Sequence, residues 1–157
     1  MLNDSKFSGV KITPLKKWED ARGWLCEIWR TDEIPAEVTP VMTYLSLTRP
    51  GVVRGPHEHV HQTDLFAFLG PSRFCLHLWD NRDGSPTFGQ HETFEGGEGE
   101  PFVAIVPPGV VHGYKNVGEV DGMVVNCANK LYKGVGKIEE VDEIRHEADQ
   151  NSQFKVN

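Results

Sequence analysis

Three histidines, His57, His59 and His61, lie at every second position in the segment GVVRGPHEHVHQ, residues 51–62. In a β-strand, residues two apart point to the same face, so all three rings could enter one cavity. Two chemistries suit such a row. Neutral imidazoles can bind a divalent metal ion, whereas a single imidazole with its ordinary pKa near neutrality can move protons without a metal.

A second segment, PPGVVHGYKN at residues 107–116, adds His112. Together His57, His59, Asp64 and His112 offer nitrogen and oxygen ligands for a metal such as Mn, Fe, Ni or Zn, with positions left open for water or substrate. The alternative is that several of these side chains pack in the interior or bind a ligand directly, with His61 facing solvent. Asp64 could equally be a turn residue that opens the apolar run DLFAFL, since aspartate favours turns.

Short strands are the elements expected to position these side chains. Glycine, proline, asparagine or aspartate ends each of the alternating or apolar runs, a pattern typical of strands joined by turns. The runs cover residues 9–15, 23–30, 41–47, 64–69, 73–79, 102–108 and 122–128. Many short strands predict a β-sandwich or barrel. Only residues 137–150, KIEEVDEIRHEADQ, have apolar residues three apart between charged ones, which predicts one short C-terminal helix.

Composition limits the range of functions. The 157 residues, 38% hydrophobic and 10% aromatic, fit one domain over residues 1–157. A net charge of −7 argues against nucleic-acid and anionic-membrane partners, so an anionic ligand would need a local arginine cluster. The three cysteines are widely spaced, and neither a signal-peptide pattern nor a bilayer-length apolar run is present. We therefore expect a soluble protein of the reducing cytoplasm.

The two histidine segments resemble the paired signature motifs of the cupin superfamily, small jelly-roll barrels in which both motifs line one cavity. The first segment supplies His57, His59 and Asp64, where the superfamily usually has glutamate, and the second supplies His112. The resemblance implies an all-β cupin jelly-roll β-barrel, which the short C-terminal helix would close.

Four stretches occur in the order seen in one cupin branch, the dTDP-4-dehydrorhamnose 3,5-epimerases. They are DARGWLCE at 20–27, GVVRGPHEH at 51–59, WDNRDGSPTFGQ at 79–90 and PPGVVHGY at 107–114. The family resembled is a metal-free group of cupin homodimers without a cofactor, which acts in surface polysaccharide synthesis. The resemblance implies an epimerase or isomerase acting on a 4-keto-6-deoxy sugar linked to dTDP or another nucleoside diphosphate.

The resemblance also implies catalytic roles. His57 matches the general base that removes a proton next to the sugar's 4-keto group, Tyr132 the acid that returns one from the opposite face, and Asp149 the aspartate that orients the histidine. The alternatives are an edge tyrosine with its hydroxyl in solvent for Tyr132 and, favoured for Asp149 by the shorter intervening region, an ordinary solvated acid at a helix end. The family usually has a lysine in a Q-x-K-L stretch, but this chain reads QTDL and has Asp64 there. A missing oxyanion donor commonly costs on the order of a hundredfold. The replacement therefore cripples the family reaction, indicates a different one, or makes Asp64 a ligand of a metal that supplies the positive charge.

Binding roles follow from the same resemblance. Arg22, Arg54 and Arg82 match family arginines at the nucleotide site, where guanidinium groups suit phosphate oxygens; each could instead form a surface ion pair of little energetic value. The family dimer lends its D-x-R-G strand to the partner's cavity, so a strand-exchanged homodimer would place Arg22 and Glu27 in the other subunit's site.

Three functions stay open at this point. In the epimerase interpretation, His59, Asp64 and His112 contact the nucleotide sugar. A metal-dependent cupin enzyme would use the same three residues with His57 as ligands. A non-catalytic sugar-nucleotide binding protein would keep the arginines and lack the lysine.

Overall fold

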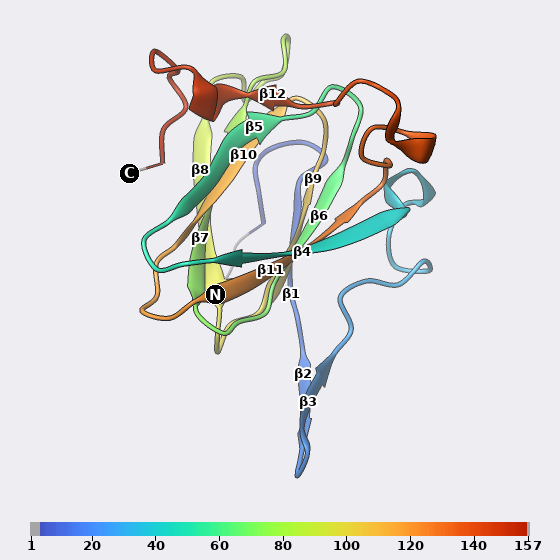
Figure 1. Cartoon of the computed structure of the whole chain (residues 1–157), viewed down its shortest axis with the longest axis vertical. Coiled ribbons are helices and arrows are strands. Elements are labelled where there is room, and N and C mark those ends of the chain that lie inside the picture. Colours follow the sequence, from blue (N-terminus) through green and yellow to red (C-terminus); the bar gives the residue numbers. More distant parts are fainter. Residues whose placement is uncertain (1–3, 157) are drawn as a thin grey trace.

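The computed structural model describes residues 4–156 and consists largely of antiparallel β-strands (Figure 1). From edge to edge, the first sheet contains β1 (Lys11–Pro14), β9 (Phe102–Val106), β6 (Asp64–Phe68), β11 (Gly122–Ala128) and β4 (Met42–Thr48). The second sheet contains β12 (Ile144–Arg145), β5 (Val53–Glu58), β10 (Val110–Asn116), β7 (Arg73–Asp80) and β8 (His91–Gly97). The predicted all-β jelly-roll architecture is confirmed. Among the described residues, no helix has the length and apolar character needed to cross a membrane.

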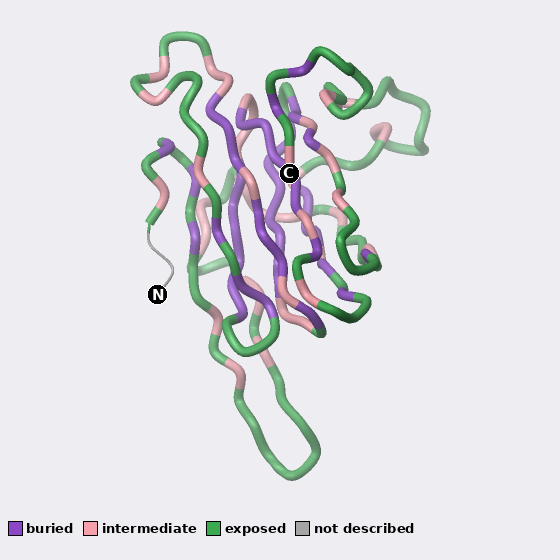
Figure 2. Tube along the Cα trace, turned by 90° about the vertical axis from the view of Figure 1, so that its left-hand side faces the viewer, coloured by how far each residue is buried: buried purple, intermediate pink, exposed green. Residues whose placement is uncertain are grey.

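Aromatic side chains fill the space between the two sheets. Phe68 stacks on Phe102 with ring centroids 4.7 Å apart, Tyr114 meets Phe68 edge to face, and the Phe74 ring packs against Phe68 at a tilt of 51°. Figure 2 shows this buried layer along the middle of the strands, with exposed chain confined to the loops and edges. Burial of such large rings contributes much of the free energy of folding and fixes the barrel on which the site is built.

A hairpin projects away from the barrel (Figures 1 and 2). It is formed by β2 (Lys17–Asp20) and β3 (Gly23–Cys26), which pair only with each other. Trp18, Trp24 and Leu25 on this hairpin are 56%, 48% and 62% exposed. Large apolar side chains so exposed on a protruding element are typical of a surface that another chain covers.

The predicted helix over residues 137–150 is wrong. This region contains the end of one 3-10 turn, Val135–Lys137, then extended chain with β12, and a second turn, His146–Ala148. Pairing of β12 with the edge of β5 and hydrogen bonds to Asp142 hold the chain extended, and the tertiary contacts override the local helical pattern. Residues 129–145, here called the strap, thus cross the open end of the barrel from β11 to β12 (Figure 1).

Candidate active site

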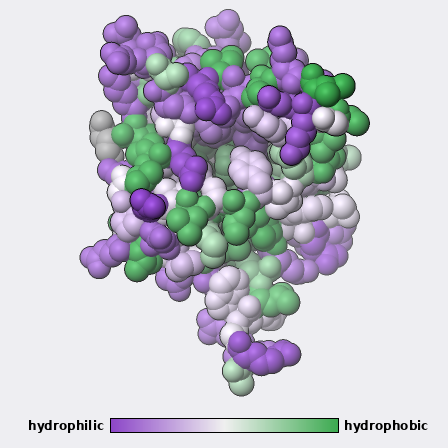
Figure 3. Space-filling model, viewed as in Figure 1, coloured by the Kyte–Doolittle hydropathy of each residue, from purple (hydrophilic) through white to green (hydrophobic). Residues whose placement is uncertain are grey.

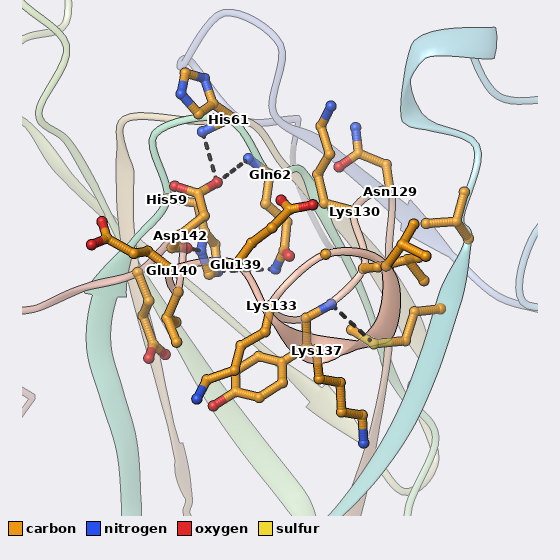
Figure 4. A pocket seen from close by; sticks show the side chains of 18 of the residues that line it. His59, His61, Gln62, Asn129, Lys130, Lys133, Lys137, Glu139, Glu140 and Asp142 are labelled. Atoms are coloured by element: carbon orange, nitrogen blue, oxygen red, sulfur yellow. Dashed lines mark hydrogen bonds between the residues drawn. The ribbon is translucent and has the colours of Figure 1, made fainter.

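A cavity of about 850 Å³ lies between the open end of the barrel and the strap. Side chains of β4, of β5 and its following loop, and of the strap line it, and Figure 4 shows several of them gathered around the opening. Its volume is in the range of small-molecule sites, which are concave and carry a few convergent polar groups.

Four side chains from three segments converge beside this cavity, and two of them, His57 and His59, line it. The ligand atoms of His57, His59, Asp64 and His112 all lie within 4.8 Å of one another. The rings of His57 and His112 have centroids 4.5 Å apart, because these residues face each other across β5 and β10. The two histidine segments meet in one cluster, but only the first lines the cavity, through His57, His59 and His61. His61 is exposed and lies outside the cluster.

Gly55 in the RGPH motif permits this approach of the two strands. Its φ is +79°, and a Cβ atom there would lie 2.8 Å from the main-chain oxygen of His112. A side chain would therefore be strained and would push β5 away from β10. The glycine explains how His57 comes to lie against His112.

Asp64, at the start of β6, is fully buried at the centre of the cluster. Its Oδ2 lies 3.0 Å from Nε2 of His59 and 3.2 Å from Nε2 of His112. Its Oδ1 accepts hydrogen bonds from the side-chain amides of Gln62 and Asn126 at 2.8 and 2.9 Å. The alternative of an exposed turn aspartate is therefore wrong.

Main-chain carbonyl groups fix the orientation of two of the rings. Nδ1 of His59 donates to the main-chain oxygen of Asp142, and Nδ1 of His112 donates to that of Val110 at 3.0 Å. Because a carbonyl oxygen only accepts, each Nδ1 carries a proton. Both Nε2 atoms are thereby directed at Asp64.

Burial and charge act differently on the members of the cluster. Burial, helped by the neighbouring His112 and His59, lowers the pKa of His57 to about 2, so this ring is neutral at neutral pH. Burial also opposes the charged form of His59, but the contacts with Asp64 and Asp142 outweigh it and raise the pKa of that ring. Despite complete burial, His112 and His59 hold the pKa of the Asp64 carboxyl well below its usual range. The site therefore contains an ionised carboxylate beside a neutral base.

A carboxylate approaches His57, but it is not the predicted Asp149. Nδ1 of His57 lies 3.8 Å from Oε1 of Glu143 in the strap, and Arg145 fixes the other oxygen of Glu143 at 2.7 Å. Asp149 is exposed, does not line the cavity, and accepts a hydrogen bond from the main chain of Asn151. Its placement beside His57 is wrong, because β12 carries the chain past His57 before Asp149 is reached.

Two tyrosines line the cavity. Tyr132 of the strap is the predicted one and is partly exposed. Tyr44 of β4 was not predicted; its hydroxyl accepts a hydrogen bond of 2.7 Å from Asn126, which also bonds Asp64. The position of Tyr44 opposite Asn126 depends on the β4–β11 register, which the sequence alone does not give. Gln62 and Asp142 were also missed: Gln62 carries no motif signal, and Asp142 reaches the site only through the path of the strap.

The predicted arginines lie outside this chain's cavity. Arg54 donates to Thr48 Oγ1 at 2.9 Å, and Arg82 donates to Asp80 at 2.8 Å. Arg22 and Glu27 lie at the projecting hairpin, where the Arg22 side chain is 90% exposed. The cations that do line the cavity come from the strap, namely Lys130, Lys133, Lys137 and Arg145. Of the predicted site residues, His57, His59 and Tyr132 line the cavity, whereas Asp64 and His112 are buried in the cluster with the two histidines. Their roles stay predictions.

The dTDP-4-dehydrorhamnose 3,5-epimerase family model matches residues 4–142. The chain is 36% identical over 124 residues to a protein of Haloferax volcanii named probable low-salt glycan biosynthesis epimerase Agl13, covering 78% of this chain and 79% of that protein. It is also 36% identical over 124 residues to the spore coat polysaccharide biosynthesis protein SpsL of Bacillus subtilis, covering 79% and 81%.

A solved structure has the same fold over nearly the full chain. The dTDP sugar isomerase of Desulfovibrio desulfuricans superposes with a TM-score of 0.80 at 23% identity, covering 99% of this chain and 93% of that one. At this identity the likeness establishes the arrangement of strands. It agrees with the two-sheet barrel derived above.

Proposed function

Because the chain belongs to the dTDP-4-dehydrorhamnose 3,5-epimerase family, we propose that it epimerises or isomerises a 4-keto-6-deoxy sugar linked to dTDP or a related nucleotide, in glycan or polysaccharide biosynthesis. One observation carries this proposal. His57, at the motif position of the family base, lines a cavity that two tyrosines also line, and its Nδ1 lies 3.8 Å from the Glu143 carboxylate.

His57 is the proposed base. Its ring takes a proton from the carbon next to the 4-keto group, the C–H bond breaks, and the electron pair moves to the keto oxygen as an enolate. Glu143, held by Arg145, is the group placed to orient the ring. Tyr132 returns a proton to the opposite face of the carbon, after which solvent reprotonates Tyr132 and removes the proton from His57.

The proposal is tested by incubating the protein with dTDP-linked 4-keto-6-deoxyglucose in deuterium oxide and following the ring protons by NMR. Exchange at carbon 3 or carbon 5, with inversion at either centre, supports the proposal and tells how many centres are inverted. If a panel of nucleotide-linked 4-keto sugars shows no exchange, but dTDP raises the melting temperature, the protein is the non-catalytic binding protein instead.

A homodimer is part of this proposal. The hairpin formed by β2 and β3 exposes two tryptophans, and Leu45 and Leu47 on the edge strand β4 are 59% and 51% exposed. Figure 3 shows hydrophobic side chains gathered over β4 and continuing toward the hairpin. A second copy that receives the hairpin would cover both surfaces and would bring Arg22 and Glu27 to its partner's cavity. Arg54 and Arg82 remain predicted nucleotide contacts, and the cytoplasmic location remains a prediction.

A metal-dependent reaction is the second candidate function, and a specific geometry favours it. The Nε2 atoms of His59 and His112 lie 3.0 and 3.2 Å from Asp64 Oδ2. Neighbouring ligand atoms on a metal with bonds of about 2.1 Å are about 3.0 to 3.4 Å apart, so these distances suit a shared metal ion. Among the residues described, Asp64 Oδ2 and His112 Nε2 are buried atoms without a hydrogen-bond partner of good geometry.

These donors fit a first-row transition metal. His59, His112 and Asp64 would hold it, with His57 as a fourth ligand or as the neighbouring base, and the fixed Nδ1 protons leave both Nε2 atoms free to ligate. Such a metal would supply positive charge to the keto oxygen, which Asp64 cannot.

Elemental analysis of untagged protein decides between the two candidates. A metal-dependent site predicts about one equivalent of a transition metal, lost in Asp64→Asn and retained in His61→Gln, a control from the same segment. Less than about a tenth of an equivalent, even after reconstitution, would contradict the metal-dependent candidate and leave the epimerase proposal intact.

A further inference from the structure

Tyr44 points toward the histidine cluster, as the strand register requires. Asn126 of β11 lies opposite Tyr44 of β4 on one side and opposite Phe66 of β6 on the other. Directly opposite residues share a face of an antiparallel sheet. Phe66 is buried, and its ring centroid is 5.3 Å from that of His112. Tyr44 is therefore on the inner face at the level of the cluster, where it lines the open cavity and stays 46% exposed, and its neighbour Leu45 points outward.

A chain of hydrogen bonds ties the Tyr44 hydroxyl to the buried carboxylate. The side-chain amide nitrogen of Asn126 donates one hydrogen to Tyr44 Oη at 2.7 Å and the other to Asp64 Oδ1 at 2.9 Å. Gln62 donates to the same Oδ1 at 2.8 Å. The hydroxyl oxygen is thus held by an amide whose position the buried Asp64 fixes.

This arrangement leaves the hydroxyl proton of Tyr44 available. Because Asn126 is the donor, Tyr44 Oη acts as the acceptor and its own hydrogen is not used in that bond. Within the part of the chain that the structure describes, Tyr44 Oη donates to no other group. Partial burial of the half-exposed Tyr44 first, and then the charge of Asp64, raise its pKa, so the hydroxyl remains a neutral donor at neutral pH.

The proposed reaction lacks a donor for the enolate oxygen. The position that matches the family lysine is occupied by Asp64, which is acceptor-only when ionised. We propose that the hydroxyl of Tyr44, held by Asn126, donates a hydrogen bond to the keto oxygen of the sugar and stabilises the enolate in place of that lysine. This inference rests on the proposed function, since it needs an enolate to form.

The strap lysines are the competing donors. Lys133 lines the same cavity, and its Nζ lies 5.9 Å from the centre of the Tyr132 ring. It is anchored only through a mobile side chain of four methylene groups, whereas Tyr44 comes from a strand and is fixed by a buried amide. A preorganised donor stabilises developing charge better than one that must be ordered during the reaction.

The test compares Tyr44→Phe with Lys133→Met and Tyr132→Phe in the deuterium exchange assay. The inference expects Tyr44→Phe to slow exchange and inversion together by about a hundredfold in kcat. Affinity for dTDP and the melting temperature should stay close to those of the wild-type protein, which shows that the variant is folded and binds nucleotide. Lys133→Met should lose less in kcat than Tyr44→Phe, although Lys133 also lines the cavity.

The outcomes separate the inference from the function on which it rests. Wild-type exchange with an unchanged rate in Tyr44→Phe would overturn the inference and leave the epimerase proposal standing. A hundredfold loss of kcat in Lys133→Met, with kcat unchanged in Tyr44→Phe, would assign the hydrogen-bond donor to the strap and would also overturn the inference. Absence of exchange in the wild-type protein with every nucleotide-linked 4-keto sugar would overturn both.

Discussion

The main-chain oxygen of Asp142 accepts a hydrogen bond from Nδ1 of His59, so the strap itself orients a ring of the histidine cluster. The carboxylate of the same residue accepts from the main-chain N–H groups of Val60, His61 and Gln62 at 2.8 to 2.9 Å. One side chain thus closes the loop after β5 and fastens the strap across the cavity.

Replacement of Asp142 by alanine should loosen the strap. The variant loses three charge-assisted hydrogen bonds, and the three main-chain N–H groups then bond only to water. The free energy of unfolding should therefore fall by about 2 to 3 kcal/mol. Urea denaturation measures this change. Glu140→Ala, an exposed acid on the same strap, is the control and should change stability by less than about 0.5 kcal/mol. Equal stability of the two variants would refute the fastening role.

Tyr132→Phe should separate exchange from inversion. His57 can still remove a proton and, in deuterium oxide, return a deuteron to the same face, so exchange continues while the opposite face receives no proton. The ratio of inverted to exchanged sugar, measured by NMR, should fall at least about tenfold. An unchanged ratio would mean that another group, with Tyr44 the first to examine, is the acid.

The projecting hairpin should be required for the dimer. Trp24→Ser removes a large exposed apolar side chain from β3, and we expect it to shift the protein from dimer to monomer in sedimentation or light-scattering measurements. Phe88→Ser, at a site 53% exposed on the loop before β8, is the matched control and should stay dimeric. A wild-type protein that is monomeric at micromolar concentration would remove the role of Arg22 and Glu27 in a partner's site.

Asp80 should make stability pH-dependent. Its buried carboxylate bonds Arg82, Ser85 and Thr87, and the Arg82 contact foremost holds its pKa well below the usual range. In the unfolded chain the pKa of an aspartate is about 4. Because the pKa of Asp80 is lower in the folded protein, its carboxylate stabilises the fold fully at pH values above about 4, and this stabilisation is lost as the pH falls toward the folded-state pKa.

Asp80→Asn tests this sign directly. At pH 7 the variant should be less stable than the wild-type protein by about 2 kcal/mol, and the difference should shrink at pH 3. Urea titrations at the two pH values measure it. A difference that grows on acidification would contradict the assignment.

How far the sequence predicts the structure depends on the range of the contacts involved. Runs such as DLFAFL and RFCLHLW carry their strand pattern locally, and each expected run contains a strand in the structure. The convergence of His57 and His112 is also predictable, because both lie in motifs with characteristic spacing.

The contacts that could not be predicted are those set by pairing between distant segments. Residues 137–150 carry a helical pattern, yet the pairing of β12 with β5 and the carboxylate of Asp142 hold the strap extended. Tyr44 becomes a site residue only through its register with Asn126, and Glu143 takes the place expected for Asp149 only because the strap ends beside His57. Local sequence does not encode these relationships.

The central claim is that His57 is the base, and comparison of His57→Ala with wild-type protein tests it most directly. His61→Ala is the control, since it removes an exposed imidazole from the same segment. With dTDP-linked 4-keto-6-deoxyglucose in deuterium oxide, we expect exchange in the wild-type protein and in His61→Ala, and none above background in folded His57→Ala. Exchange in His57→Ala at the wild-type rate would contradict the account.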